Sequence, residues 1–140
     1  MDLKNGDGEH GEFQPLQFHF HAPSEHTVEG YYYPAEVHFV HLGCRDKSQG
    51  NQCGQVAVLG IFFETMKPYE DNPFLNEVFG AFETRDWPEG QGKVSIDIDE
   101  FYDTFVTDAY WSYQGSFTTP PCTEGVQWTV LKTPQNISYS

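Results

Sequence analysis

Residues 17–28 read QFHFHAPSEHTV, and this stretch decides the fold. Phe18 and Phe20 alternate with His19 and His21, which predicts a β-strand with the aromatic rings on one face and the imidazoles on the other. The alternation ends at the proline that follows. Because side chains two apart on a strand lie on the same face, we expect the two imidazoles to be close neighbours.

The rest of the chain is also built from short alternating segments. Residues 35–42 alternate so that Glu36, His38 and Val40 share one face. Residues 55–64 are apolar on both faces, which predicts a central strand. Other strands are predicted over 16–21, 26–28, 93–98, 111–117 and 126–131, while residues 1–14 are predicted as loop and residues 31–34 as a turn.

One helix is predicted over residues 73–83. Asn72 can cap its first turn, and Pro73 suits the first helical position. An apolar stripe follows at helical spacing, made of Phe74, Val78, Ala81 and Phe82. The sequence therefore predicts one domain over residues 1–140, mainly β with a short helix, in the α+β class.

The formal net charge of -14 limits the kinds of partner that this protein can bind. Such a surface repels phosphate backbones and anionic lipid, so nucleic acid and membrane surfaces are not expected partners. No apolar run reaches the roughly 18–20 residues that cross a bilayer. Residues 1–6 are polar and lack a signal-peptide pattern. Two interpretations stay open: an intracellular protein, or a missing true N-terminus.

The cysteine count is odd. Cys44 and Cys53 flank a polar, glycine-containing segment, where a local disulfide is one option. Cys122 then has no partner. Its alternatives are a free thiol, an intermolecular bond or a partner outside this chain.

The histidines on the first two predicted strands suggest a metal site. His38 lies on a strand that can pair with the strand of His19 and His21, and three imidazoles from two strands match catalytic zinc with its fourth position open to water. Neutral ligands leave the ion fully charged, which lowers the pKa of bound water towards ~7. Gln17 and Glu36 each precede a histidine by two residues, so each can accept that ligand's second N–H and orient the ring.

Two alternatives compete with a zinc site of this kind. Alternating histidines also occur as polar residues on an exposed strand face. His19, His21 and Glu25, followed by Gly30, also resemble the first metal motif of cupins, in which the glutamate is a ligand. The second cupin motif is not matched, because no glycine precedes His38 at the required place and no asparagine follows it at the required distance.

Two long motifs carry a family resemblance. The first is residues 17–28 continuing into 35–41, and the second is residues 110–128, YWSYQGSFTTPPCTEGVQW. Both resemble the signatures of α-class carbonic anhydrases, and residues 57–62 resemble the family's central strand. The Ala-Pro form of the first motif is nearer to bacterial, plant and protist members. The resemblance implies a central, mostly antiparallel twisted sheet. We expect that sheet to be incomplete at both ends, because the chain is shorter than the family's catalytic domain.

The resemblance also implies roles for individual residues. His19, His21 and His38 match the zinc ligands. Thr118 matches the threonine that accepts a hydrogen bond from zinc-bound hydroxide, and Glu25 matches the glutamate that accepts the threonine's proton. Thr119 matches a residue of the bicarbonate site, and Phe117 stands where the family usually has leucine, which narrows the pocket. The residues that match the apolar wall for carbon dioxide are Val40, Val58, Val126 and Trp128.

The function implied by this resemblance is zinc-dependent, reversible hydration of carbon dioxide to bicarbonate and a proton. The alternative is a truncated, inactive or binding-only module on the same scaffold. The resemblance implies a secreted, periplasmic or extracellular location. In many exported members of the family that the sequence resembles, the cysteine at the position of Cys122 pairs with an N-terminal cysteine, which this chain lacks. His10 is not placed by any motif as the residue that carries protons to solvent, and the oligomeric state is left open.

Overall fold

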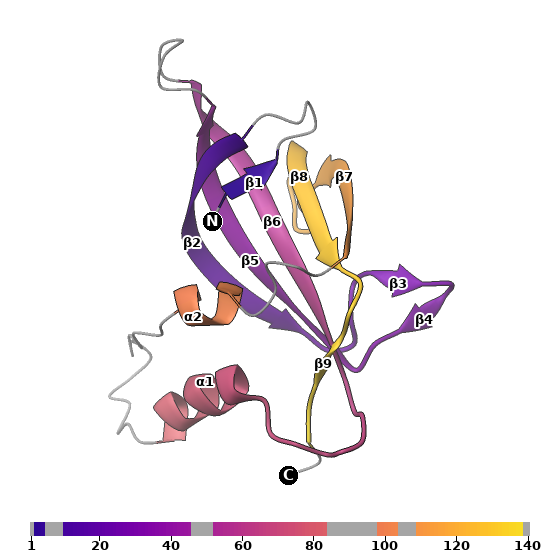
Figure 1. Ribbon diagram of the computed structural model, residues 1–140. Coiled ribbons are helices and arrows are strands. Elements are labelled where there is room, and N and C mark those ends of the chain that lie inside the picture. The colour runs from indigo at the N-terminus through magenta and orange to yellow at the C-terminus, as the bar shows by residue number, and fades with distance from the viewer. Residues whose placement is uncertain (1, 5–9, 46–51, 84–97, 104–108, 139–140) are drawn as a thin grey trace.

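A computed structural model describes residues 2–4, 10–45, 52–83, 98–103 and 109–138. Within these ranges, seven strands form one sheet in the order β1-β2-β5-β6-β8-β7, with β9 paired to β6 (Figure 1). The strands of this sheet are β1 (Asp2–Lys4), β2 (His10–His21), β5 (Ala35–Arg45), β6 (Gln52–Glu64), β7 (Tyr110–Ser116), β8 (Glu124–Leu131) and β9 (Gln135–Asn136). Two short strands, β3 (Thr27–Val28) and β4 (Tyr31–Tyr32), form a separate hairpin.

Most neighbours in the large sheet run antiparallel. β2 pairs with β5, β5 with β6 and β7 with β8 in this way, whereas β6 runs parallel to both β8 and β9. The predicted mainly-β fold with a mostly antiparallel sheet is confirmed, and the parallel pairing at β6 makes it a mixed sheet. β6 occupies the interior because its side chains are apolar on both faces, so each face can pack against a different layer.

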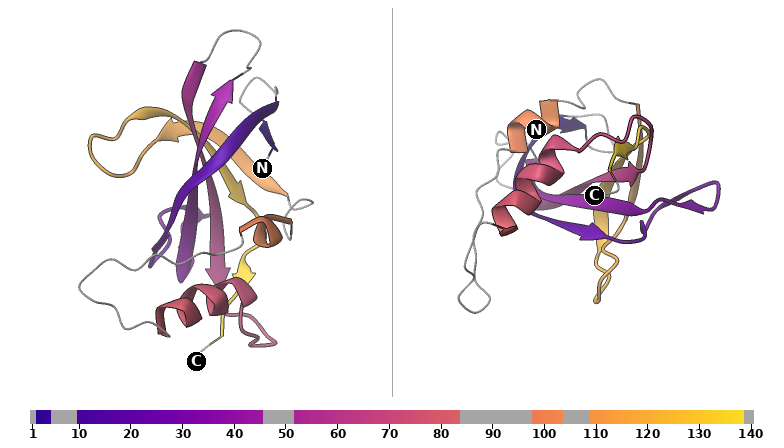
Figure 2. Two further views of the ribbon diagram at one scale, coloured as in Figure 1. Left: turned by 90° about the vertical axis from the view of Figure 1, so that its left-hand side faces the viewer. Right: turned by 90° about the horizontal axis from the view of Figure 1, so that it is seen from below.

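Helices cover one face of the sheet. Helix α1 (Pro73–Glu83) and helix α2 (Ile98–Asp103) lie on the same side of the strands, opposite the side towards which the β7–β8 connection projects (Figure 2). Four side chains of these helices, Phe74, Val78, Phe101 and Tyr102, pack against buried side chains of the sheet in one cluster. The sheet residues of this cluster are Val37, Phe39, Leu59, Ile61, Phe63 and Leu131. A second cluster on the other face contains Val40, Val58, Phe62, Val126, Trp128 and Val130. Alternate side chains of β5 and β6 therefore pack into two separate hydrophobic clusters, one on each face of the sheet.

The predicted helix has the predicted bounds. The Asn72 side-chain oxygen accepts hydrogen bonds from the backbone N–H of Phe74 at 3.1 Å and of Leu75 at 3.2 Å. These contacts satisfy two of the N–H groups that a helix start leaves without a partner, so Asn72 is the cap that the sequence indicated.

Two local predictions are wrong. Residues 1–14 are not all loop, because β1 pairs with β2 and β2 extends back to His10. Phe13 supplies the reason: it is buried, it packs with Ala57, and Gly43 leaves room for its ring. The predicted turn at residues 31–34 contains strand β4, which pairs with β3.

The strand predicted over residues 93–98 is contradicted at its last residue. Residues 93–97 lie outside the described part of the chain, and Ile98 begins helix α2 instead of ending a strand. The ring of Phe101 in that helix stacks on Phe74 of α1 at a centroid distance of 4.0 Å. Burial of an aromatic ring against α1 therefore accompanies the helical form of this segment.

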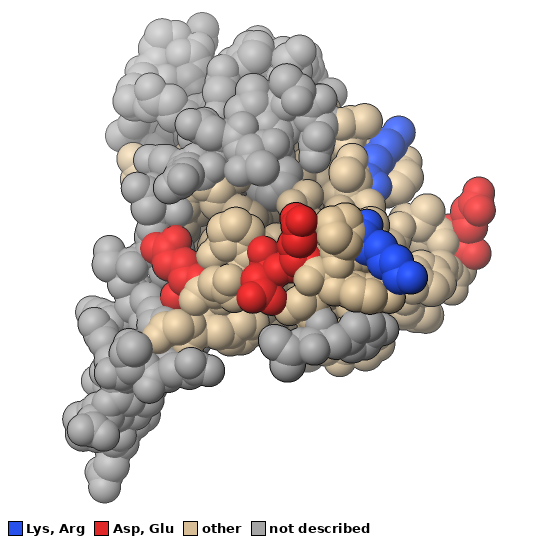
Figure 3. Space-filling view, turned by 60° about the horizontal axis from the view of Figure 1, so that its bottom comes forward, with Lys and Arg blue, Asp and Glu red and all other residues tan. Residues whose placement is uncertain are grey.

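The cysteine prediction is only partly covered. Cys44 and Cys53 face each other in the β5–β6 register, but their side chains lie outside the described residues. Cys122 is a free, exposed thiol. In the part of the chain that the structure describes, no helix is long and apolar enough to cross a membrane. Figure 3 shows acidic side chains near the middle of one face, in keeping with the net charge of -14.

Candidate metal centre

Three imidazoles converge on the face of the sheet that carries no helix. His19 and His21 come from β2, and His38 lies on β5 directly opposite His19 in the strand register. One ring nitrogen from each histidine lies within 4.8 Å of the others. The ring centroids are 4.9 Å apart for His19 and His21, 5.3 Å for His19 and His38, and 4.6 Å for His21 and His38. The structure thus brings together the three residues that the sequence singled out.

The environment of the His19 ring favours its neutral, metal-binding form. Burial lowers the pKa of His19, the neighbouring His38 and His21 lower it further, and Glu25 opposes the shift. His21 Nε2 is buried and has no hydrogen-bond partner among the described residues. An orphaned buried nitrogen of this kind costs about 1–3 kcal/mol, and a metal ion would remove that cost. A donor set of three imidazole nitrogens, one of them this orphaned atom, fits Zn²⁺.

Two polar side chains orient two of the rings. The Gln17 side-chain oxygen lies 2.9 Å from His19 Nδ1, and Glu36 Oε1 lies 2.9 Å from His38 Nε2. Both pairs follow the spacing of two residues noted in the sequence. Because a carbonyl or carboxylate oxygen only accepts, each ring donates an N–H there and turns its other nitrogen to the centre.

Glu36 is a fully buried carboxylate with many donors. It is 0% exposed, and its second oxygen accepts the backbone N–H groups of Glu25 and His26, each at 2.9 Å. Burial acts to raise the pKa of Glu36, but hydrogen bonds from His26 and His38 outweigh it and hold the pKa well below its usual range. Gly60 provides the space, because a Cβ there would lie 2.9 Å from Glu36 Oε1.

Thr118 and Glu25 meet beside the histidines although 93 positions separate them in the chain. The Thr118 hydroxyl donates to Glu25 Oε2 at 2.8 Å. The same oxygen lies 3.5 Å from His21 Nε2 and 3.9 Å from His38 Nδ1. Since the hydroxyl has one hydrogen and spends it on Glu25, only its lone pairs remain to accept a hydrogen bond.

An apolar wall stands next to the three histidines. Val40, Val58, Val126 and Trp128 belong to one buried cluster, and Phe117 packs against it. The Trp128 ring lies 4.8 Å from the His38 ring, which places this wall beside the candidate centre. Thr119 is exposed, and its carbonyl accepts the backbone N–H of Cys122 at 2.9 Å in the turn between β7 and β8.

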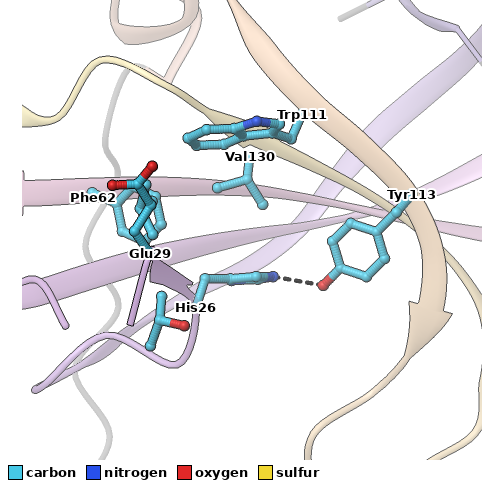
Figure 4. Close-up of a pocket in the computed structure, with 8 residues that line it drawn as sticks. His26, Glu29, Phe62, Trp111, Tyr113 and Val130 are labelled. Carbon is cyan, nitrogen blue, oxygen red and sulfur yellow. Dashed lines mark hydrogen bonds between the residues drawn. The ribbon is translucent and has the colours of Figure 1, made fainter. Parts of the chain in front are cut away.

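His26, Glu36 and His38 form a second group with ligand atoms within 4.8 Å of one another. Its atoms already bond to each other and to Tyr113: His26 Nδ1 is 2.6 Å from Glu36 Oε1, and His26 Nε2 is 2.5 Å from the Tyr113 hydroxyl (Figure 4). The first group is therefore where a metal ion fits. Sequence patterns did not point to Tyr113 or Gly60, because no spacing along the chain relates residues on separate strands.

Fold and site together define a mixed-sheet protein with a three-histidine centre of the type that holds catalytic zinc. The sequence matches the family model described as "Eukaryotic-type carbonic anhydrase" over residues 1–140, and the chain belongs to this family.

Similar proteins come from plants, bacteria and fungi. The chain is 37% identical to alpha carbonic anhydrase 4 of Arabidopsis thaliana over 91% of its own length and 42% of that protein. It is 39% identical to a carbonic anhydrase of Nostoc sp. over 89% of its own length and 43% of that protein.

Among solved structures, the fungal alpha carbonic anhydrase of Aspergillus oryzae matches with a TM-score of 0.72 and 31% identity, over 91% of this chain and 51% of that one. The Thermovibrio ammonificans enzyme in complex with sulfanilamide matches with a TM-score of 0.69 and 40% identity, over 95% of this chain and 52% of that one. The chain thus spans about half the length of its relatives. Because the chain belongs to the carbonic anhydrase family, the cupin alternative is rejected.

Proposed function

We propose that this chain carries the zinc centre of a carbonic anhydrase, which hydrates carbon dioxide reversibly to bicarbonate and a proton. The observation that carries the proposal is the Thr118–Glu25 hydrogen bond of 2.8 Å beside three converging imidazoles. Three histidines alone are compatible with many metal sites. A hydroxyl that is forced to act as an acceptor next to them favours a reaction in which a protonated oxygen must be held and aimed.

His19, His21 and His38 would hold Zn²⁺, and bound zinc lowers the pKa of a coordinated water towards ~7. Gln17 and Glu36 keep two of these rings in the orientation and tautomer that ligation needs.

Thr118, with its hydrogen committed to Glu25, accepts a hydrogen bond from the attacking oxygen and so selects and orients its protonated form. The apolar wall that contains Val40, Val58, Val126 and Trp128 suits an uncharged substrate such as carbon dioxide. Thr119 lies at the exposed edge of the same region and is assigned to bicarbonate.

The relatives support this choice of reaction. Those described above are carbonic anhydrases by name, and one was solved with the inhibitor sulfanilamide. A sulfonamide is therefore a suitable probe for this chain as well. The secreted, periplasmic or extracellular location and the single domain over residues 1–140 stay predictions.

The test is to express residues 1–140, measure bound zinc, and assay carbon dioxide hydration with and without a sulfonamide. We expect one zinc ion per chain and hydration that the sulfonamide suppresses. His21→Ala should lose both zinc and activity, whereas Tyr32→Phe, at an exposed position of the separate β3–β4 hairpin, should retain both. Zinc bound to Glu25, or zinc without hydration, would overturn the proposal, and the second result would favour the binding-only alternative.

A further inference from the structure

The triplet Asn136-Ile137-Ser138 matches the acceptor pattern for N-linked glycosylation. It comprises the last residue of β9 and the two residues that follow, and it has no part in the proposed reaction. β9 lies beside the end of β6, where the chain turns towards α1 (Figure 1). An acceptor asparagine is normally exposed, because the attached glycan is bulky and hydrophilic, so the contacts of this triplet decide whether it can be modified.

The side-chain amide of Asn136 is hydrogen-bonded through both of its polar atoms. Its oxygen accepts the backbone N–H of Met66 at 2.9 Å, and its nitrogen donates to the backbone carbonyl of Pro68 at 2.5 Å. The residue also pairs with Glu64 in the parallel register of β6 and β9. The nitrogen to which a glycan would be attached is therefore held against another segment of the chain.

The next two residues bind the same segment. The backbone N–H of Ile137 donates to the carbonyl of Glu64 at 3.0 Å, and its partly buried side chain packs against the hydrophobic cluster under the helices. The Ser138 hydroxyl donates to Asp71 Oδ1, directly before the residue that caps α1. All three residues of the acceptor pattern thus contact residues 64–71, which connect β6 to α1.

Glycan transfer requires these groups in a different arrangement. The Asn136 Nδ2 atom attacks the anomeric carbon of a lipid-linked oligosaccharide, so that a C–N bond forms and the C–O bond to the lipid diphosphate breaks. The lipid diphosphate leaves, and the amide nitrogen loses one proton. The amide must therefore leave Met66 and Pro68 to react, and the Ser138 hydroxyl, which is part of the recognised pattern, must leave Asp71.

We propose that Asn136 is a glycan acceptor only while β9 is undocked, so that an attached glycan and a docked β9 exclude each other. A chain whose β9 docks first keeps its amide contacts and stays unmodified. A chain that is modified first carries a bulky sugar at the nitrogen that would otherwise contact Pro68. The inference is independent of the zinc centre and of the proposed reaction, because these contacts involve none of the three candidate ligands.

The first test compares the acceptor in its docked and free forms. The 140-residue chain and a synthetic peptide of residues 131–140 are incubated with a purified oligosaccharyltransferase and a lipid-linked oligosaccharide, and mass spectrometry reports the modified fraction. We expect the peptide to react at least about tenfold faster, since only the locally opened fraction of the folded chain can react. Ser138→Ala should prevent the reaction in both. Equal rates for the wild-type chain and peptide would overturn the proposal.

A matched pair of variants tests whether docking of β9 gives the protection. Ile137→Gly keeps the acceptor pattern but removes the side chain that packs against the cluster under the helices, whereas Ile137→Val keeps most of that packing. We expect Ile137→Gly to react at nearly the rate of the peptide and Ile137→Val to react as slowly as the wild type. The same changes in the peptide correct for the preference of the transferase at the middle residue. Equally slow reaction of both variant chains would count against the proposal.

Hydrogen exchange tests the exclusion in the opposite direction. The Met66 and Ile137 amides donate to Asn136 Oδ1 and to the Glu64 carbonyl, so their protection from exchange reports the docked β9. In the fraction of the chain that becomes glycosylated during a prolonged incubation, both amides should lose protection, whereas the amides between β5 and β6 should keep it. Unchanged protection of Met66 in the glycosylated chain would show that the glycan and the docked strand coexist, which would overturn the proposal.

Discussion

The two faces of the sheet bury their residues for different reasons. On the helix-covered face, Val37 and Phe39 pack against apolar side chains of α1 and α2. On the opposite face, the alternate residues of the same strand, Glu36 and His38, are 0% and 1% exposed. The first kind of burial is favourable by itself. The second is unfavourable unless every polar atom finds a partner.

The difference shows what each face can do. On the helix face, the buried cluster around Val37 and Phe39 is made of hydrophobic residues, and the hydroxyl of its Tyr102 lies 2.8 Å from His41 Nε2. The histidine face surrounds Glu36 with donors and leaves His21 Nε2 without a hydrogen-bond partner among the described residues. Apolar burial on the helix face therefore stabilises the fold, whereas the buried polar groups of the histidine face lower stability wherever they lack a partner.

The largest effect is expected from a cavity on the helix face. Phe39→Ala removes a buried ring that contacts Phe18, Phe74 and Phe101, and should lower the free energy of unfolding by about 3–5 kcal/mol. Urea unfolding measures the loss, and zinc affinity of the folded protein should stay unchanged. Leu42→Ala, at an exposed position of the same strand, should cost less than about 0.5 kcal/mol. Equal losses in the two variants would show that the helix face is not the main core.

A smaller effect is expected from a single added methyl group on the other face. Gly60→Ala places a Cβ 2.9 Å from Glu36 Oε1, which should cost about 1–3 kcal/mol by overpacking and should also weaken zinc binding. Gly80→Ala in α1 is the matched control, because nothing lies within 4 Å of its added Cβ. That variant should gain up to about 1 kcal/mol from helix propensity. Unchanged zinc affinity in Gly60→Ala would show that the position of Glu36 does not affect metal binding.

The stability of the protein should fall at acidic pH because of one histidine on each face of the sheet. Burial lowers the folded-state pKa of His41 and of His19, so the unfolded chain binds more protons as pH falls below about 6.5. Stability is thus fully present above that pH and declines below it. Urea midpoints across the range should show a shallower decline for His41→Asn. Added zinc should remove the part due to His19, since ligation excludes the proton. A decline that zinc leaves unchanged would contradict the assignment of His19 to the centre.

The Glu36 carboxylate adds a separate contribution at lower pH. Its folded-state pKa is depressed, so its stabilising effect is present above about pH 4.3 and is lost as pH falls further. The Glu36→Gln variant should show a flatter decline in this range, and the same urea titration measures it.

The smallest effect concerns turnover. Phe117 packs against the apolar wall beside the histidines, and its ring should narrow the space for carbon dioxide. Phe117→Leu is expected to hydrate carbon dioxide faster while binding zinc equally well, as measured by stopped-flow assay and chelator competition. Equal or slower hydration by the leucine variant would show that this side chain does not limit the reaction.

Local patterns predicted much of the fold. The strand over residues 35–42, the central strand over 55–64 and the helix over 73–83 were all recoverable, because alternation, apolar runs and capping residues act within a few positions. The extension of β2 back to His10 was missed, since it depends on Phe13 finding Gly43 and Ala57 across two other strands. The segment at Ile98 was assigned to the wrong structure because its packing partner lies on α1.

The sequence by itself determined that His19 and His21 share a strand face, that Gln17 and Glu36 precede their histidines by two residues, and that the chain resembles one family. Side-chain direction along a strand has a period of two, so these relations are local. The tertiary structure decided the rest: His38 lies opposite His19, Thr118 reaches Glu25 across 93 positions, and Tyr113 reaches His26 across 87. Strand register and the return of distant segments depend on packing of the whole sheet, which spacing along the chain does not encode.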